Sequence, residues 1–191
     1  MKKLFLFINE SPVIMKKLLT IMLLLTAMGA QAQTGAAKKA VANIRELYAE
    51  AKQMIAYNNM SEETRNQMIV NISHMVAAIG HQDKIVTYYF NTDFDEDAGD
   101  YISKPYFITI TYNVAARKHY EEYLLKGNGD IIFAYLSGDS IDPTVGRFEA
   151  RYYWQNDELV HQQLKGDEML SDTDAFDQAH RLKEAFTYLM H

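Results

Sequence analysis

The side chains in this chain with the clearest metal-like spacing are three aspartates in one short run. Asp93, Asp95 and Asp97 stand two residues apart, as do the first carboxylate ligands of a calcium-binding loop. Such a loop also needs Gly at its sixth position and Glu at its twelfth, where this chain has Ala98 and Lys104. We therefore expect a solvated acidic loop and no metal site, with the three aspartates as weak candidates for calcium.

Nucleophilic catalysis has no candidate in the sequence. The chain contains no cysteine, and it lacks the Gly-x-Ser-x-Gly elbow of serine hydrolases. Its glycine-rich stretch, residues 127–129, lies between two predicted strands, whereas a phosphate-binding loop precedes a helix. The six histidines never show the spacing of a zinc site, and we expect His161 to be a buried, hydrogen-bonded histidine. The sequence therefore indicates no catalytic residue and no cofactor.

One predicted strand carries a polar aromatic face that is the candidate binding surface. Arg147, Glu149, Arg151 and Tyr153 alternate along the chain, so their side chains lie on the same side of the strand. We expect this side to be exposed, because the residues between them are apolar. An exposed aromatic ring beside charged groups can stack on a sugar or dock a protein partner. The alternative is that the tyrosines form cross-strand pairs that stabilise the sheet itself.

A second functional hypothesis uses carboxylates on the same face. Glu121, Glu122 and Glu149 lie in predicted strands and could converge as the acid and base of a small glycan-processing or other hydrolase. Two carboxylates within about 10 Å across a concave pocket favour such an enzyme, whereas a flat polar face favours binding. We prefer the non-catalytic hypothesis, because the sequence shows no pocket signature.

The candidate binding residues and the three glutamates lie within residues 119–167, which the sequence predicts to be two similar β-hairpins in tandem. The spacing from Ile131 to Leu-x-Gly-Asp at 136–139 equals the spacing from Leu159 to Leu-x-Gly-Asp at 164–167. Two copies are too few for a solenoid, so we predict four consecutive strands of an antiparallel meander. The alternation places Phe148, Ala150, Tyr152 and Trp154 in the core, and Phe133 on the face of Ile131 and Tyr135.

Further elements precede and follow this repeat. Residues 85–90 and 106–112 are rich in β-branched and aromatic residues and predict strands. Residues 66–76 fit both a helix and a strand, and their β-branched content slightly favours a strand. Apolar residues at helical spacing predict helices over 36–58 and 173–190. The fold class is therefore α+β: a single domain with an antiparallel meander sheet of about five or six strands packed on an N-terminal and a C-terminal helix, in two layers.

The first 32 residues have the pattern of a secretory signal peptide. Met15-Lys16-Lys17 is a basic start, 18–28 is an apolar run, and Ala30-Gln31-Ala32 is a small-x-small cleavage site. We expect translation to begin at Met15 and the mature domain to cover 33–191. The apolar run is too short to span a membrane, and without cysteine the mature chain has no lipid anchor. The pattern predicts a soluble periplasmic or secreted protein.

The charge balance restricts the partners of the mature chain. The full sequence has a net charge of −6, and removal of the four Lys and one Glu in residues 1–32 makes it −9. An acidic surface repels nucleic-acid phosphates, so we expect no nucleic-acid binding and no membrane span. The expected partner is a protein or a glycan in the cell envelope or outside the cell.

Four segments of the chain resemble a family of small exported bacterial α+β proteins to which no activity is assigned. They are Asn-Val-Ala-Ala-Arg at 113–117, Tyr-Glu-Glu-Tyr-Leu at 120–124, the Gly-Asn-Gly-Asp turn at 127–130 and Arg-Tyr-Tyr-Trp at 151–154. The resemblance covers roughly residues 60–167. It implies a single exported domain and supplies no catalytic residue.

Overall fold

The computed structural model describes residues 12–60, 66–77, 80–140, 142, 144, 146–166 and 170–190, and for 12–34 it describes the backbone alone. The chain divides into two compact units, residues 1–39 and residues 40–191. The described part of the first unit is helical and belongs to α1 (Pro12–Asn58). Residues 1–11 of the predicted signal peptide lie outside the described residues. No helix in the part of the chain described here is long and apolar enough to cross a membrane.

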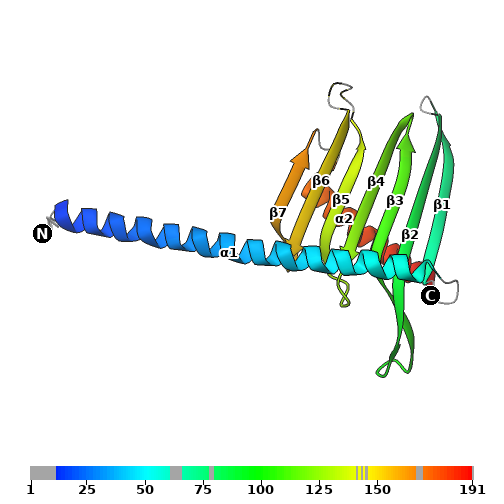
Figure 1. The fold of residues 1–191 in the computed structure, drawn as a ribbon, viewed down its shortest axis with the longest axis horizontal. Helices are drawn as coiled ribbons and strands as arrows, with labels where there is room; N and C mark the ends of the chain where they lie inside the picture. Colours follow the sequence, from blue (N-terminus) through cyan, green and yellow to red (C-terminus); the bar gives the residue numbers. More distant parts are fainter. Residues whose placement is uncertain are drawn as a thin grey trace, which may run out of the picture. The chain divides into compact units, whose positions relative to one another are not determined.

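The second unit contains one antiparallel sheet whose seven strands follow each other in chain order (Figure 1). The strands are β1 (Gln67–Val76), β2 (Gly80–Asp95), β3 (Asp100–Val114), β4 (Arg117–Leu125), β5 (Ile131–Asp139), β6 (Arg147–Gln155) and β7 (Glu158–Lys165). The predicted meander is confirmed, but the expected number of five or six strands is wrong. The ambiguous segment 66–76 forms β1, in agreement with its β-branched content.

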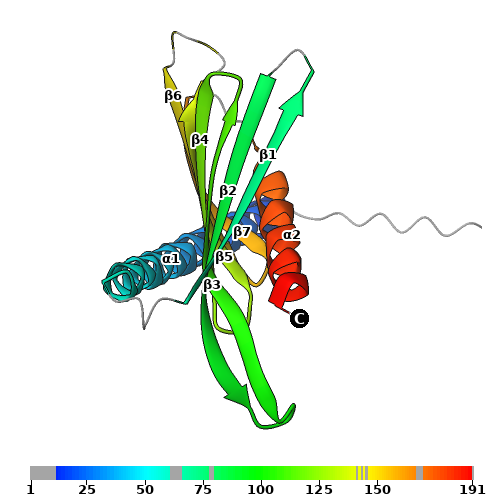
Figure 2. The same ribbon diagram turned by 90° about the vertical axis from the view of Figure 1, so that its right-hand side faces the viewer.

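Helices cover both faces of this sheet, which gives three layers in place of the expected two. Figure 2 shows the C-terminal part of α1 on one face and α2 (Asp172–Met190) on the other. The α2 face holds the larger apolar cluster, in which Trp154 packs on Phe176 of α2 with ring centroids 5.3 Å apart. The α1 face holds a second cluster, in which four buried α1 residues meet the strands: Val41, Ile44, Ala51 and Ile55. Each face of the sheet therefore presents apolar side chains, and a helix covers them on each side.

Three β-bulges bring additional apolar residues to the α1 face. The pairing of β4 with β5 shifts between Leu124 and Leu125, so that Ile132 is the extra residue. Val160 is the extra residue in β7, and Tyr106 is the extra residue in β3. All three belong to the cluster beneath α1. A bulge adds one residue to one strand and bends it locally, so these strands present two successive side chains to the helix.

The bulges confirm the hairpin repeat and correct one detail of it. Ile132 and Val160 occupy equivalent positions in the two hairpins, so the repeat extends to the irregularity of its strands. The bulge also moves Phe133 to the α1 face, whereas Ile131 belongs to the cluster under α2. The prediction that Phe133 shares the face of Ile131 is therefore wrong, because strict alternation does not hold across a bulge.

A capping box marks the start of α2. Ser171 Oγ accepts a hydrogen bond from the Asp174 backbone N–H at 3.1 Å and donates to the Asp174 carboxylate at 2.8 Å. This satisfies one of the free N–H groups in the first turn of the helix. The helix then buries a stripe at helical spacing against the sheet: Ala175, Ala179, Leu182 and Phe186.

Candidate ligand-binding site

The strand register places polar residues in one row across the α1 face of the sheet. From β2 to β7 this row is Thr87, Thr109, Glu122, Tyr135, Arg151 and Gln163. The next row lies beneath α1 and is largely aromatic or aliphatic: Tyr89, Phe107, Leu124, Phe133, Tyr153 and His161. The edge of α1 therefore runs along a boundary between an apolar row and a polar row.

Glu122 is a buried carboxylate at this boundary. Its Oε1 accepts hydrogen bonds from Lys52 Nζ at 2.8 Å and from the Tyr120 hydroxyl at 2.6 Å, and its Oε2 accepts one from the Tyr48 hydroxyl. A buried charge is tolerated when it is paired and hydrogen-bonded, and here a cation and two hydroxyls supply both. Glu122 thus ties α1, through Tyr48 and Lys52, to the middle of the sheet.

The tyrosines around Glu122 are held in their neutral form. Burial raises the pKa of Tyr48 and of Tyr120, and the hydrogen bond that each donates to Glu122 raises it further. Neither phenol is therefore available as a base near neutral pH. Because the Glu122 oxygens accept three hydrogen bonds, the cluster is built to position α1 on the sheet.

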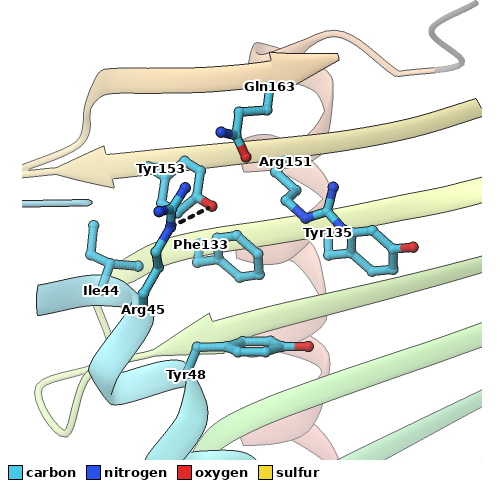
Figure 3. Close-up of a pocket in the computed structure, with 8 residues that line it drawn as sticks. All are labelled: Ile44, Arg45, Tyr48, Phe133, Tyr135, Arg151, Tyr153 and Gln163. Atoms are coloured by element: carbon cyan, nitrogen blue, oxygen red, sulfur yellow. Dashed lines mark hydrogen bonds between the residues drawn. The ribbon is translucent and has the colours of Figure 1, made fainter. Parts of the chain in front are cut away.

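A pocket opens next to this cluster, between α1 and the last three strands. Its volume is about 510 Å³, and Figure 3 shows the residues that line it. The lining comes from α1 (Ile44, Arg45, Tyr48), β5 (Phe133, Tyr135), β6 (Arg151, Tyr153) and β7 (Gln163). It contains four aromatic rings, two guanidinium groups, one amide and one aliphatic side chain, and no carboxylate.

Aromatic rings position both guanidinium groups of the pocket. Arg151 lies over the Tyr135 ring, with its guanidinium carbon 4.7 Å from the ring centroid, and also donates to Glu149 Oε2 at 3.1 Å. Arg45 lies over the Tyr153 ring at 5.7 Å, and its Nε donates to the Tyr153 hydroxyl at 3.5 Å. Cation–π contacts of this kind hold a guanidinium group through its flat face and do not use its N–H donors.

The structure separates the four predicted binding residues. Tyr153 and Arg151 line the pocket, and Glu149 contacts Arg151 beside it. Arg147 is exposed at the start of β6, opposite Asp139, and does not line the pocket. The expectation that the Tyr153 ring is exposed is wrong, because only 2% of its surface is accessible beneath α1.

Of the eight residues that line the pocket, the sequence predicted only Arg151 and Tyr153 as binding residues, and it missed the other six. Arg45 and Tyr48 are two of these six, and both lie on α1, within the helix predicted over 36–58. One signal was present: Arg45 follows Ile44 directly, so it flanks the buried stripe. Which strands such a flanking residue meets depends on long-range packing, and no local pattern reports that.

One of the three carboxylates of the hydrolase hypothesis lies on the opposite face of the sheet from the other two. Glu121 and Glu122 are neighbours on β4, so they project to opposite faces, and Glu121 points to α2. There Glu121 accepts hydrogen bonds from the Tyr123 hydroxyl at 2.7 Å and from Gln178 of α2. Burial raises the pKa of Glu121, against the lowering effect of these hydrogen bonds. The expectation that Glu121 converges with the other two is wrong, and of the three carboxylates only Glu122 and Glu149 share the α1 face.

The acidic run at 93–97 covers the end of β2 and the start of the turn that follows, and Asp95 stabilises this turn. The strands β2 and β3 continue to Asp95 and Asp100, so the expected polar loop is a hairpin with a short turn at its tip. Asp95 Oδ1 accepts the backbone N–H groups of Asp97 and Ala98, each at 3.1 Å, as an aspartate does in a turn of this type. Within the described ranges, no group of three or more His, Asp or Glu side chains is arranged to hold a metal ion.

The prediction that His161 is buried is wrong, and the structure buries His119 instead. His161, predicted to be buried, is exposed on β7, where its ring lies 5.6 Å from that of Tyr153. His119 on β4 is the buried histidine, with its ring stacked 4.9 Å from Tyr112 on the α2 face. Neither ring nitrogen of His119 has a hydrogen-bond partner among the described residues.

Comparison of the chain with protein-family models, with curated proteins and with solved structures finds no match. The chain is therefore described by its own geometry. It is an antiparallel α+β protein with a pocket that carries two guanidinium groups, where a helix meets one face of the sheet.

Proposed function

We propose that this protein is an exported, non-catalytic binding protein that holds a small anionic ligand in the pocket between α1 and β5–β7. The observation that carries the proposal is the pair of guanidinium groups, Arg45 and Arg151, in a lining without a carboxylate. Guanidinium groups bind carboxylates and phosphates through paired N–H donors. Aromatic contacts hold both groups in place before the ligand arrives, which reduces the entropy lost on binding.

The electrostatics favour a small anion over a large one. The chain as a whole carries a net charge of −6, so a polyanion is repelled at long range. A compact anion within the pocket interacts chiefly with Arg45 and with Arg151, of which Arg151 also pairs with Glu149, since long-range repulsion is screened within about 8–10 Å at physiological salt. The Gln163 amide adds a donor and an acceptor for a hydroxyl group of the ligand. A sugar that carries a carboxylate fits this pocket: it is compact, its carboxylate can bind the arginines, and its hydroxyl groups can bind the Gln163 amide.

The two buried glutamates support binding over hydrolysis. Glu122 is occupied by three hydrogen bonds that fix α1, and Glu121 faces the opposite side of the sheet. A glycosidase needs two carboxyl groups on either side of the scissile bond. The pocket lining provides neither of them.

The test is a calorimetric titration of the protein with glucuronate, with glucose as the neutral analogue and inorganic phosphate as the alternative anion. We expect glucuronate to bind and glucose to bind at least tenfold more weakly. The substitutions Arg45→Gln and Arg151→Gln should each weaken glucuronate binding by about tenfold or more, because a hydrogen bond to a charged group contributes about 1.5–3 kcal/mol. Phosphate binding as tight as that of glucuronate would assign the pocket to phosphate groups.

Arg147→Gln is the matched control, since Arg147 lies on the same strand and the same face but outside the pocket. It should leave the affinity unchanged. Equal binding of glucose and glucuronate, or an Arg147→Gln effect as large as that of Arg151→Gln, would overturn the proposal.

A further inference from the structure

The two edges of the sheet differ in how they are protected. β1 and β7 are the outermost strands (Figure 1), and no further strand of the described chain pairs with either. β7 has the features with which natural proteins block an edge: a bulge at Val160 and charged residues at its ends, Glu158 and Lys165. The β7 edge of this sheet is therefore protected against further strand pairing.

β1 lacks all of these features. It pairs with β2 through ten consecutive residue pairs without a register shift. Its sequence, Gln-Met-Ile-Val-Asn-Ile-Ser-His-Met-Val, contains no Asp, Glu, Lys, Arg or Pro. A long, regular and uncharged edge strand is a template for pairing with another strand. Its unpaired backbone N–H and C=O groups give such pairing its affinity.

β1 also exposes large apolar side chains at regular intervals. Ile69, Ile72 and Met75 have exposed fractions of 51%, 44% and 73%. By alternation, Ile69 and Met75 lie on the α1 face and Ile72 lies on the α2 face. A surface of this kind on an otherwise acidic protein indicates a contact with something apolar and uncharged.

These positions are self-complementary. In an antiparallel pair of two β1 strands related by a twofold axis through Ile72, Ile72 lies opposite its own copy. Ile69 of each chain then lies opposite Met75 of the other, on the same face, and Asn71 lies opposite Ser73. Each exposed large apolar side chain of β1 thus meets another one, and no charges are brought together. A twofold contact requires such self-complementarity.

We propose that β1 is the contact through which two copies of this chain form a dimer, with their sheets joined antiparallel about an axis at Ile72. The net charge of −6 on each chain opposes association over most of the surface, and β1 is an uncharged strip where this repulsion is least. The contact lies on the strand farthest in the sheet from β7, a lining strand of the pocket, so the dimer does not depend on the proposed anion site.

The absence of cysteine in the chain allows a direct test by single cysteine substitutions in the full-length protein. Opposed residues of antiparallel strands have Cα atoms about 4.5–5.5 Å apart, which is within the range of a disulfide. Ile72→Cys should therefore form covalent dimers under mild oxidation. Ile69→Cys and Met75→Cys should form few when each is alone and many when the two variants are mixed.

Leu164→Cys is the matched control, because Leu164 is 47% exposed on the opposite edge strand. It should remain monomeric on a non-reducing gel. If Ile72→Cys crosslinks no more than Leu164→Cys, or if Ile69→Cys crosslinks better alone than when mixed with Met75→Cys, the proposed axis is wrong.

Sedimentation velocity supplies a second test without covalent chemistry. The unmodified protein should be a dimer whose dissociation constant rises at least tenfold in Ile72→Lys, while Leu164→Lys leaves it unchanged. A monomer over the whole concentration range would overturn the proposal, even if a strand peptide of different sequence were found to bind β1. Ile72→Lys should retain its binding of glucuronate, which separates a failure of this inference from a failure of the anion site.

Discussion

At the scale of single residues, the adjacent glutamates of β4 serve two different faces of one sheet. Glu122 anchors α1 through Tyr48 and Lys52, and Glu121 anchors α2 through Gln178. Each is buried, and each accepts a further hydrogen bond from a tyrosine hydroxyl of its own strand. Their placement follows from strand alternation, which directs neighbouring side chains to opposite faces wherever a strand has no bulge. Glu121 and Glu122 are thus best understood as the polar anchors of the two helices.

The burial of Tyr153 raises the loss of stability that we expect when this side chain is truncated. Truncation of an exposed ring costs little, but this ring is 2% exposed and lies 5.0 Å from that of Phe133. We expect Tyr153→Ala to lower the free energy of unfolding by about 3–5 kcal/mol, as much as Trp154→Ala on the other face. Denaturant melts measure both.

Tyr153→Phe is the control for the Tyr153 prediction. It keeps the ring and removes only the hydroxyl that accepts the 3.5 Å hydrogen bond from Arg45, so it should cost about 0.5–1.5 kcal/mol. A Tyr153→Ala variant that unfolds at the same denaturant concentration as Tyr153→Phe would show that α1 does not cover the ring in solution.

At the scale of elements, the hairpin repeat was predictable and its bulges were not. The matching spacings after Ile131 and Leu159 identify two equivalent hairpins from the sequence alone. The local run at 131–133 is apolar throughout, so it does not reveal which residue is inserted. The choice is made by the cluster beneath α1, which takes up Ile132 and Phe133 together. Long-range packing of a helix on the sheet thus determines a local irregularity of the strand.

The tightest turn of the repeat permits a stabilising substitution. Asn156 and Asp157 connect β6 to β7 with φ angles of 52° and 63°, the left-handed region required at both positions of a type I′ turn. Glycine adopts this conformation without the steric cost that Asp carries. We expect Asp157→Gly to raise the free energy of unfolding by about 0.5–1 kcal/mol, measured by thermal melts.

Gln155→Gly is the control for the turn, because Gln155 is an exposed strand residue next to it. Glycine in a strand loses more conformational entropy on folding, so this variant should be less stable than the unmodified protein. A loss of stability in both variants would contradict the assigned turn conformation.

At the scale of the whole molecule, the fold class followed from the sequence more fully than the site did. Helical spacing and alternation are local properties, and they located α2, the C-terminal end of α1 and most strands. The pocket depends on which face each helix covers. Arg151 and Tyr153 were found because they alternate on one strand. Arg45 and Tyr48 were missed because they lie about a hundred residues away from them in the sequence. The exposure of Tyr153 was mispredicted for the same reason.

The acid sensitivity of the folded chain should depend on His119. Its ring is 2% exposed, and a Cβ atom added at Gly138 would lie 2.3 Å from its Nδ1, so the ring has no space to move toward β5. Burial lowers the pKa of His119 below its ordinary value of 6.5, the charge of Arg117 lowers it further, and Asp139 opposes this effect. Below pH 6.5 the unfolded chain therefore binds a proton that the folded chain does not.

The free energy of unfolding should consequently fall as the pH drops from about 7 toward the lowered pKa of His119, with a slope of up to about 1.4 kcal/mol per pH unit from this residue. The raised pKa of Glu121 acts in the opposite direction at lower pH, because the folded chain then takes up a proton first. Denaturant melts between pH 7.5 and pH 5 measure the slope, and His119→Leu should flatten it. A His119→Leu profile parallel to that of the unmodified protein would show that another group causes the acid sensitivity.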